Sequence, residues 1–181
     1  MRDISDHILD LMENSIRAGA TVVGVAVVRD AAKDRLVVTV ADDGAGLKVR
    51  PQEATDPFFT TKAGKVTGLG LSLLKAAAER AGGTFAIGPS PRGGTTVLVT
   101  MQIGHVDREP LGDLACAISS IVCTSPEIEV YCRIGADGRT RDIRTSDYAA
   151  GGPPKGLRGL AVARQVSESI RGAVSALAVG D

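Results

Sequence analysis

The sequence has few aromatic residues and no net charge. Phe, Tyr and Trp make up 3% of its 181 residues, and Trp is absent. Because 44% of the residues are hydrophobic, the chain can still bury a core, which we expect to consist of Val, Leu, Ile and Ala. Lys plus Arg and Asp plus Glu both number 21, so the formal net charge is zero. General nucleic-acid binders carry an excess of basic residues, and we therefore expect no nucleic-acid partner.

Long apolar segments are also missing. A helix needs about 20 consecutive apolar residues to span a bilayer, and neither such a run nor an apolar signal-peptide stretch is present. We therefore expect a cytoplasmic protein without membrane contact. Cys116, Cys123 and Cys132 form no CxxC pair, which favours small buried apolar residues in a reducing compartment over a structural metal site.

Residues 3–18 predict a helix with an apolar face and a polar stripe. The apolar face contains Ile4, Ile8, Leu9, Leu11, Met12, Ser15 and Ile16. The polar stripe contains Asp3, His7, Asp10, Asn14 and Arg17. In an isolated helix such a stripe is most simply a face turned to solvent. The motifs further along the chain favour a functional role instead.

Periodicity and turn residues predict the elements that follow. Strands are expected over 21–28, 36–41, 84–87 and 95–103, and a helix over 69–81. Residues 47–67 lack clear periodicity and predict a lid or loop. This pattern predicts an α+β fold, a two-layer α/β sandwich in which helices cover one face of a mostly antiparallel sheet.

Residues 105–181 predict a smaller α-β-β-α unit. Helices over 111–124 and 157–177 flank a hairpin over 127–134 and 140–145, which turns at Asp137-Gly138. We therefore divide the chain into a first domain, 1–104, and an accessory or partner-binding region, 105–181. The apolar helix faces exceed what a hairpin covers alone, so we expect them to pack on the first domain, on a partner protein or on a second copy of the chain.

Four short motifs follow one another along the first domain. DLMENSIRAGA begins at Asp10, DDGAG spans 42–46, DPFFTTK leads into TGLGL at 67–71, and GGTT spans 93–96. Each motif is common alone. Together they resemble the ATP-binding domain shared by DNA gyrase, the Hsp90 chaperones, histidine kinases and MutL proteins, the GHKL superfamily with its Bergerat fold. The resemblance covers the first domain and implies that ATP and Mg²⁺ bind there.

The resemblance assigns two roles on the first helix. Asn14 corresponds to the asparagine that coordinates the Mg²⁺ ion bridging the phosphates. Family members that hydrolyse ATP have a glutamate one turn earlier as general base, where this chain has Asp10. The Asp carboxylate is one methylene shorter and must lie closer to the group that it deprotonates. Glu13 lies on another flank, where it can pair with Arg17.

The resemblance also implies an adenine site. Asp42 would accept a hydrogen bond from the adenine amino group, which excludes guanine because guanine carries a carbonyl there. Gly44 and Gly46 would let the chain turn beneath the base. Alone, DDG indicates an ordinary turn. Thr95 corresponds to a threonine that supports the aspartate through water.

The segment DPFFTTK resembles the phenylalanine box of histidine kinases. Phe58 and Phe59 are expected to anchor the lid by packing. Thr61 and Lys62 follow where phosphate oxygens should lie, and a lysine ammonium there would offset phosphate charge. Lys65 could do the same, and the choice between the two lysines stays open.

The TGLGL motif implies a phosphate site at a helix start. Free N–H groups and the helix dipole favour phosphate there, which points to Gly68, Leu69, Gly70 and Leu71. Val66 stands where the kinase pattern has a further glycine, and this departure affects how the lid closes.

Two functions of different classes fit these motifs. The first is a regulatory kinase that phosphorylates a partner in trans, because no helical hairpin with a phosphorylated histidine precedes the motifs and His7 lies on the pocket helix. The second is an ATP-operated binding module or slow ATPase, in which nucleotide changes the affinity for another protein. A DNA-repair ATPase is disfavoured by the short length and neutral charge.

The partner is suggested by a further resemblance. HILDLMENSIRAGA and HVDREPLGDL are similar to segments of small stand-alone histidine-kinase-like proteins associated with NADH-linked hydrogenase subunits. The resemblance implies a subunit of a redox enzyme complex as partner. A homodimer is the other expected assembly.

Overall fold

Six strands form one sheet in the computed structural model, which describes residues 3–47, 69–149 and 158–179. The sheet order is β3-β4-β2-β1-β5-β6. The strands are β1 (Val22–Asp30), β2 (Arg35–Asp42), β3 (Thr84–Pro89), β4 (Thr95–Gln102), β5 (Glu129–Ala136) and β6 (Arg139–Arg144). The helices are α1 (Ile4–Arg17), α3 (Leu69–Arg80), α4 (Leu114–Thr124), α5 (Ser146–Ala149) and α6 (Arg158–Leu177), with a 3-10 turn at Ala31–Lys33.

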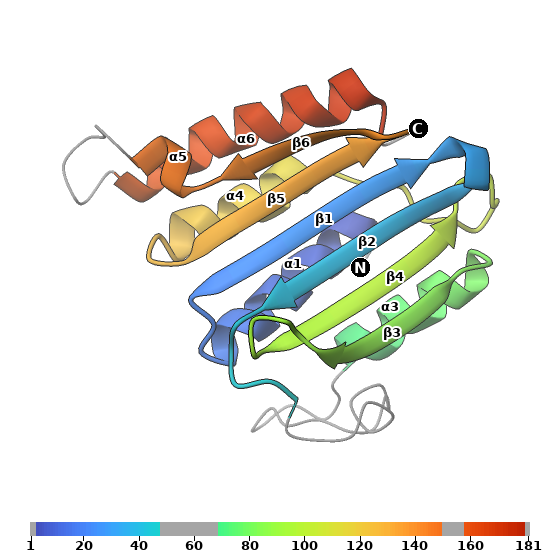
Figure 1. Ribbon diagram of the computed structural model, residues 1–181, viewed down its shortest axis with the longest axis horizontal. Coiled ribbons are helices and arrows are strands. Elements are labelled where there is room, and N and C mark those ends of the chain that lie inside the picture. The colour runs from blue at the N-terminus through green and yellow to red at the C-terminus, as the bar shows by residue number, and fades with distance from the viewer. Residues whose placement is uncertain (1–2, 48–68, 150–157, 180–181) are drawn as a thin grey trace.

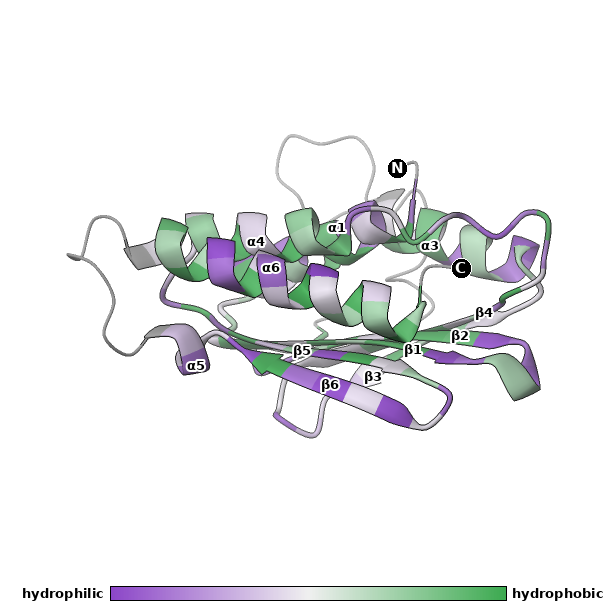
Figure 2. Cartoon of the chain, turned by 90° about the horizontal axis from the view of Figure 1, so that it is seen from above, coloured by the Kyte–Doolittle hydropathy of each residue, from purple (hydrophilic) through white to green (hydrophobic). Residues whose placement is uncertain are grey.

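The four longer helices lie on one face of the sheet (Figure 1, Figure 2). Alternating residues decide which face they cover, since side chains along a strand point to opposite sides. In β1, Val23, Val25 and Val27 are buried beneath the helices, and the residues between them are partly exposed. The strands β2 and β4 alternate in the same way. The predicted α+β sandwich with helices on one face of a mostly antiparallel sheet is confirmed.

Residues before and after position 104 share this sheet and one hydrophobic core. Strand β5 pairs in parallel with β1, from Val22 opposite Glu129 to Arg29 opposite Ala136. The other four strand pairs are antiparallel. The hairpin of β5 and β6 turns at Asp137-Gly138, as predicted, with positive φ at both residues, 52° and 83°. Two positive φ values are typical of the Asp-Gly turn that suits a right-handed sheet twist.

Most of the apolar residues of α4 and α6 are covered within the chain, and Leu160 of α6 is an exception at 62% exposed. Ile118 and Ile121 of α4 are buried, as are Val166 and Ile170 of α6. The two helices pack on each other, and α6 also packs on β5 and β6. These buried residues pack on other helices and on strands of the same chain, so their apolar area gives no argument for a partner. None of the helices in the described ranges is both long enough and apolar enough to cross a membrane.

The segment between β4 and α4 returns over the first helix. The carbonyl of Pro110 accepts a hydrogen bond of 3.0 Å from the N–H of Ile4, a donor that has no partner within its own helix. His7 is 2% exposed, and its Nε2 lies 3.1 Å from the carboxylate of Glu109. The returning segment therefore covers His7, a member of the predicted polar stripe, and this part of the stripe does not face solvent.

The three cysteines differ in exposure. Cys132 is buried on β5, whereas Cys116 and Cys123 are exposed on α4, which corrects the expectation of three buried thiols. Burial, with a smaller effect of the Asp142 carboxylate, raises the pKa of Cys132 to about 12.

We expect iodoacetamide at about pH 8 to alkylate Cys116 and Cys123 in the native protein and Cys132 only after unfolding. The thiolate is the reactive form, and it is scarce at Cys132 at this pH. Peptide mass spectrometry measures the labelling of each site. Native alkylation of Cys132 as fast as that of Cys116 would contradict its placement.

Candidate functional site

Asp42 ends β2 beneath the helix layer and is 5% exposed. Its Oδ1 accepts hydrogen bonds from the N–H groups of Gly44 at 2.9 Å and Thr95 at 3.1 Å. Its Oδ2 accepts one from the Ser15 hydroxyl at 2.7 Å. A carboxylate offers about four lone-pair sites, so these three donors leave room for one more. The carboxylate is therefore fixed in place and can still accept a hydrogen bond from a ligand.

Glycines let the backbone pass close to this carboxylate. A Cβ on Gly94 would lie 2.0 Å from Asp42 Oδ1 and 2.6 Å from both the Asp42 carbonyl oxygen and the Gly44 nitrogen. A Cβ on Gly44 would lie 3.0 Å from the Ala18 carbonyl oxygen. Gly46 has a φ of 71°, which glycine adopts without steric cost. Any larger residue at Gly94 would displace the backbone that holds Asp42. Gly94 belongs to the GGTT motif, but the motif alone did not indicate that this position must be glycine.

The DDG motif has two aspartates, and the structure distinguishes them. Asp43 accepts hydrogen bonds from the N–H groups of Thr21 and Val22 and from the Thr21 hydroxyl, at 2.7 to 2.8 Å. The Thr21 hydroxyl and then the Val22 N–H hold the pKa of Asp43 below its usual value. Because folding lowers this pKa, the stabilisation is complete at neutral pH and is lost as the pH falls through the folded-state pKa. Asp43 fastens the start of β1 to the end of β2, whereas Asp42 faces the helices.

Ser15 is a site residue that the sequence analysis missed. It was assigned to the apolar face of the first helix, where it is indeed buried. Its hydroxyl lies within hydrogen-bond distance of Asp42 Oδ2, at 2.7 Å, and of the Leu11 carbonyl oxygen, at 3.1 Å. The available signal was one hydroxyl on an otherwise apolar face. Through Ser15, α1 holds the carboxylate that ends β2.

Asp10 and Asn14 lie one turn apart on α1 and contact each other. Asn14 Nδ2 donates to Asp10 Oδ2 at 3.1 Å. Asn14 Oδ1 accepts a hydrogen bond from the Arg17 guanidinium, and Arg17 also pairs with Glu13 at 3.6 Å, as predicted. This ion pair is about half exposed, so its rearrangement costs little. A metal ion at Asn14 Oδ1 would take the place of Arg17.

The start of α3 lies against Asp10. A Cβ on Gly70 would fall 1.9 Å from Asp10 Oδ2 and 2.9 Å from its Cγ. The second glycine of TGLGL therefore allows the first turn of α3 to approach α1. Leu69 and Leu71 share this turn, so the predicted phosphate-binding backbone lies beside the predicted base and metal ligand.

Part of the predicted site lies outside the described residues. These residues are Thr61, Lys62, Lys65 and Gly68, together with Phe58 and Phe59 of the lid segment. Their contacts with phosphate or with the core stay predictions. Thr95 is described, and its backbone N–H contacts Asp42 directly. The water-mediated role of its hydroxyl also stays a prediction.

A family model described as "Histidine kinase-, DNA gyrase B-, and HSP90-like ATPase" matches residues 2–105. These residues contain every group of the pocket described above. The chain belongs to this ATPase family. It therefore contains a histidine-kinase-like ATP-binding domain, and the GHKL resemblance drawn from the four motifs is confirmed.

Two curated bacterial proteins are similar to this chain in sequence. The "Non-motile and phage-resistance protein" of Caulobacter vibrioides is 32% identical over 127 residues, which are 64% of this chain and 15% of that protein. The "Sensor histidine kinase ZraS" of Klebsiella oxytoca is 31% identical over 107 residues, 58% of this chain and 23% of that protein. The chain thus spans less than a quarter of the length of either relative.

Among solved structures, the Aquifex aeolicus MutL ATPase domain complexed with ADP has a similar fold. The TM-score is 0.50 at 17% sequence identity, and the match covers 91% of this chain and 70% of that chain. The likeness extends well beyond residue 105, so it includes strands and helices from both halves of this chain.

Proposed function

We propose that this chain is an Mg-ATP-dependent regulatory kinase of the histidine-kinase-like type, which transfers the γ-phosphoryl group to a partner protein in trans. One observation carries the proposal. Asp10 and Asn14 of α1 contact each other beside the first turn of α3, and Ser15, the next residue of α1, donates a hydrogen bond to the Asp42 carboxylate. One helix therefore connects the proposed adenine end of the pocket with the proposed phosphate end.

Asp42 fits the role of adenine acceptor. It is buried, and one of its lone-pair sites is left after three protein donors. The close backbone approach at Gly94 and Gly44 leaves no room for a Cβ atom beside Asp42, so these glycines keep the carboxylate in its position. An exocyclic amino group can donate to this carboxylate, whereas a carbonyl cannot.

The oxygen atoms at the other end suit a hard cation. Mg²⁺ prefers carboxylate and carbonyl oxygens, and Asn14 Oδ1 is such an atom once Arg17 has turned away. When bound, Mg²⁺ would offset the negative charge of the phosphates. Lys62 or Lys65, and the backbone of residues 68–71, are our proposed protein donors to the same phosphates.

Asp10 is our proposed general base. Its carboxylate would accept the proton of the partner's attacking hydroxyl while the bond from the γ-phosphorus to ADP breaks. Asp10 already accepts a hydrogen bond from Asn14 and packs against Gly70, so its position is set by both helices.

The same contacts support a second candidate, an ATP-operated binding module or slow ATPase. Asp10 is shorter than the glutamate of ATP-hydrolysing relatives and is engaged by the Asn14 amide, and both features favour slow turnover. Under either function we propose a protein partner. A redox enzyme subunit is the first to test, on the sequence resemblance stated above, and a second copy of this chain is the alternative.

Incubation with γ-³²P-labelled ATP separates these functions. The full chain is incubated alone and with the proteins that co-purify with it. Label on a partner supports the kinase, released phosphate supports the ATPase, and bound ATP without either supports the binding module. Labelling of a partner by Asp10→Asn at the wild-type rate would contradict the role of Asp10.

A further inference from the structure

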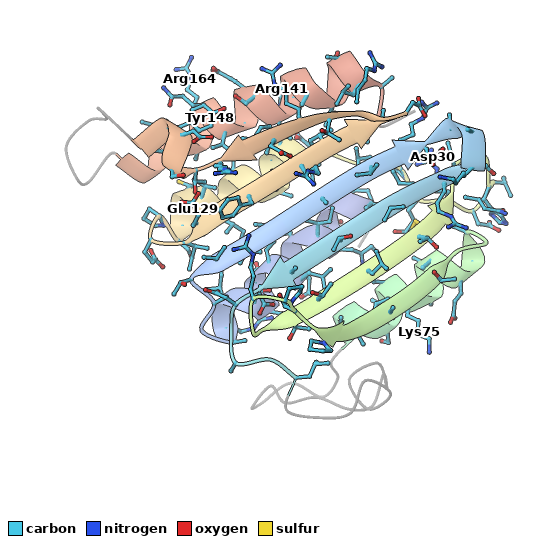
Figure 3. The ribbon with its side chains drawn as sticks, in the orientation of Figure 1. Asp30, Lys75, Glu129, Arg141, Tyr148 and Arg164 are labelled. Carbon is cyan, nitrogen blue, oxygen red and sulfur yellow. The ribbon has the colours of Figure 1, made fainter. Side chains whose placement is uncertain are left out.

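The sheet face opposite the helices carries a row of small residues. Strand pairing aligns six residues across the whole sheet, which from β3 to β6 are Gly88, Thr96, Ala41, Gly24, Tyr131 and Arg144. Their neighbours along the strands, such as Val40 and Val25, are buried beneath the helices, so this row points the other way. Figure 1 and Figure 3 look onto this face. On this face, the side chains of the row are therefore small from β3 to β1 and become large at Tyr131 of β5.

A trough of about 340 Å³ lies over this part of the sheet. Gly24, Ala26 and Ala41 contribute to its floor, and Arg92, Tyr131 and Arg144 line it as well. Its volume is within the range of sites that bind ligands. Because the proposed nucleotide-binding residues Asp10, Asn14 and Asp42 lie on the helix side, the sheet separates the two sites.

Glycine at position 24 is not required by the fold. A Cβ there would meet only the Ala41 carbonyl oxygen, at 3.6 Å, which is an ordinary contact. Glycine inside a strand is destabilising, and it often marks a place where another molecule approaches closely. A side chain at this position would fill part of the trough. We therefore attribute the glycine to the need to keep the trough open, because packing does not require it.

Two guanidinium groups stack on the ring of Tyr131. The Cζ atoms of Arg92, from the turn between β3 and β4, and of Arg144, from β6, lie 5.1 and 5.2 Å from the ring centroid. Cation–π attraction is effective at such distances. The neighbouring Arg133 is held by Asp142 at 2.7 and 2.9 Å. Within the described ranges, neither Arg92 nor Arg144 lies within ion-pair distance of a carboxylate, although the Arg144 charge, after that of Arg133, helps to hold the pKa of Asp142 below its usual value. Two positioned cations therefore border the trough.

We infer that this trough binds an acidic segment of a partner protein, whose Asp or Glu carboxylates pair with Arg92 and Arg144. The planar guanidinium fork matches a carboxylate with two parallel hydrogen bonds. The same face continues beyond the trough with partly exposed apolar residues, including Val28, Val37 and the 39% exposed Leu98. A protein segment covers this continuation as well as the trough, whereas a small anion covers the trough alone.

The test is fluorescence anisotropy with the full chain and a labelled peptide of alternating glutamate and alanine. A peptide with glutamine in place of glutamate is the uncharged probe. We expect the glutamate peptide to bind at least about tenfold more tightly, because hydrogen bonds to charged groups are the stronger ones. The double variant Arg92→Gln, Arg144→Gln should lose this preference, and Gly24→Val should weaken binding by filling the trough.

Arg141→Gln is the matched control. Arg141 is exposed on the same strand as Arg144 (Figure 3) and pairs with Ile134, whose side chain faces the helices. Peptide affinity within about twofold of wild type in this variant, with the loss in the double variant, supports the inference. The inference would be overturned if the wild-type chain bound both peptides equally or bound neither. It would also be overturned if Arg141→Gln lost as much affinity for the glutamate peptide as the double variant does. Displacement by free glutamate at the peptide's own concentration would assign the trough to small anions and overturn the protein partner.

This inference does not depend on the proposed kinase activity. Arg92, Arg144 and Gly24 make no contact with Asp10, Asn14 or Asp42 among the interactions of the described residues. Mg-ATP affinity in the trough variants should therefore equal that of the wild type. Failure of peptide binding and failure of nucleotide binding are thus separate results.

Discussion

The variant Asp42→Asn is expected to lose ATP binding and keep its fold. The asparagine side-chain oxygen can still accept hydrogen bonds from the N–H groups of Gly44 and Thr95. Its amide can donate to the Ser15 hydroxyl, which then donates to the Leu11 carbonyl oxygen at 3.1 Å. Toward adenine, however, the side-chain NH₂ group would face the adenine amino group, and two donors cannot form a hydrogen bond with each other. We expect this to cost about 2 kcal/mol of binding free energy, or roughly thirtyfold in affinity. Isothermal titration calorimetry with Mg-ATP measures the loss, and urea unfolding checks the fold.

Asp43→Asn is the matched control for this prediction. The change is the same, at the adjacent residue, but Asp43 contacts Thr21 and Val22 and not the helices. We expect a lower free energy of unfolding and an ATP affinity within about twofold of wild type. Loss of ATP affinity in Asp43→Asn as large as in Asp42→Asn would show that the motif acts only by holding the strands.

Asn14→Ala is expected to abolish Mg²⁺-dependent nucleotide binding, whereas Asp10→Asn should leave binding largely intact and slow any turnover. The metal ligand that we propose is Asn14 Oδ1, and the role that we propose for Asp10 concerns only a proton. Alanine is a good helix former, so α1 should persist in the first variant. Binding is measured by calorimetry with and without Mg²⁺, and turnover by phosphate release or partner labelling.

Glu13→Ala controls for changes on the surface of α1. Glu13 pairs with Arg17, and its removal should leave Mg-ATP affinity within about twofold of wild type, since exposed pairs contribute little. If Asp10→Asn lost binding as completely as Asn14→Ala, the division of roles between the two side chains would be wrong.

Local patterns predicted most of the elements, because each leaves a signal within a few residues. Alternation in β1, the Asp-Gly turn at 137–138 and the amphipathic first helix all lie where they were expected. The parallel pairing of β1 with β5 left no such signal. It joins residues such as Val22 and Glu129, more than 100 positions apart, and the fit of two apolar strands is decided by the whole sheet.

The site was predicted at the level of motifs, and its supporting contacts were not. Asp42 was assigned from DDGAG, but Ser15 was counted as apolar because its helix face is apolar. His7 was assigned to the polar stripe of the first helix, but its burial was not predicted, because periodicity cannot show that residues 105–113 return over this helix. The pair Arg92 and Arg144 comes together only through strand register, which brings a turn and an edge strand to one ring.

Selection of adenine by the buried Asp42 carboxylate is the property on which the proposed Mg²⁺-dependent pocket depends. It is tested most directly by calorimetric titration of the wild-type chain with ATP and with GTP, each in the presence of Mg²⁺. We predict that ATP binds and that GTP binds at least about thirtyfold more weakly, because the guanine carbonyl would face a carboxylate oxygen. Equal affinity for ATP and GTP would contradict the assignment of Asp42 and with it the proposed pocket.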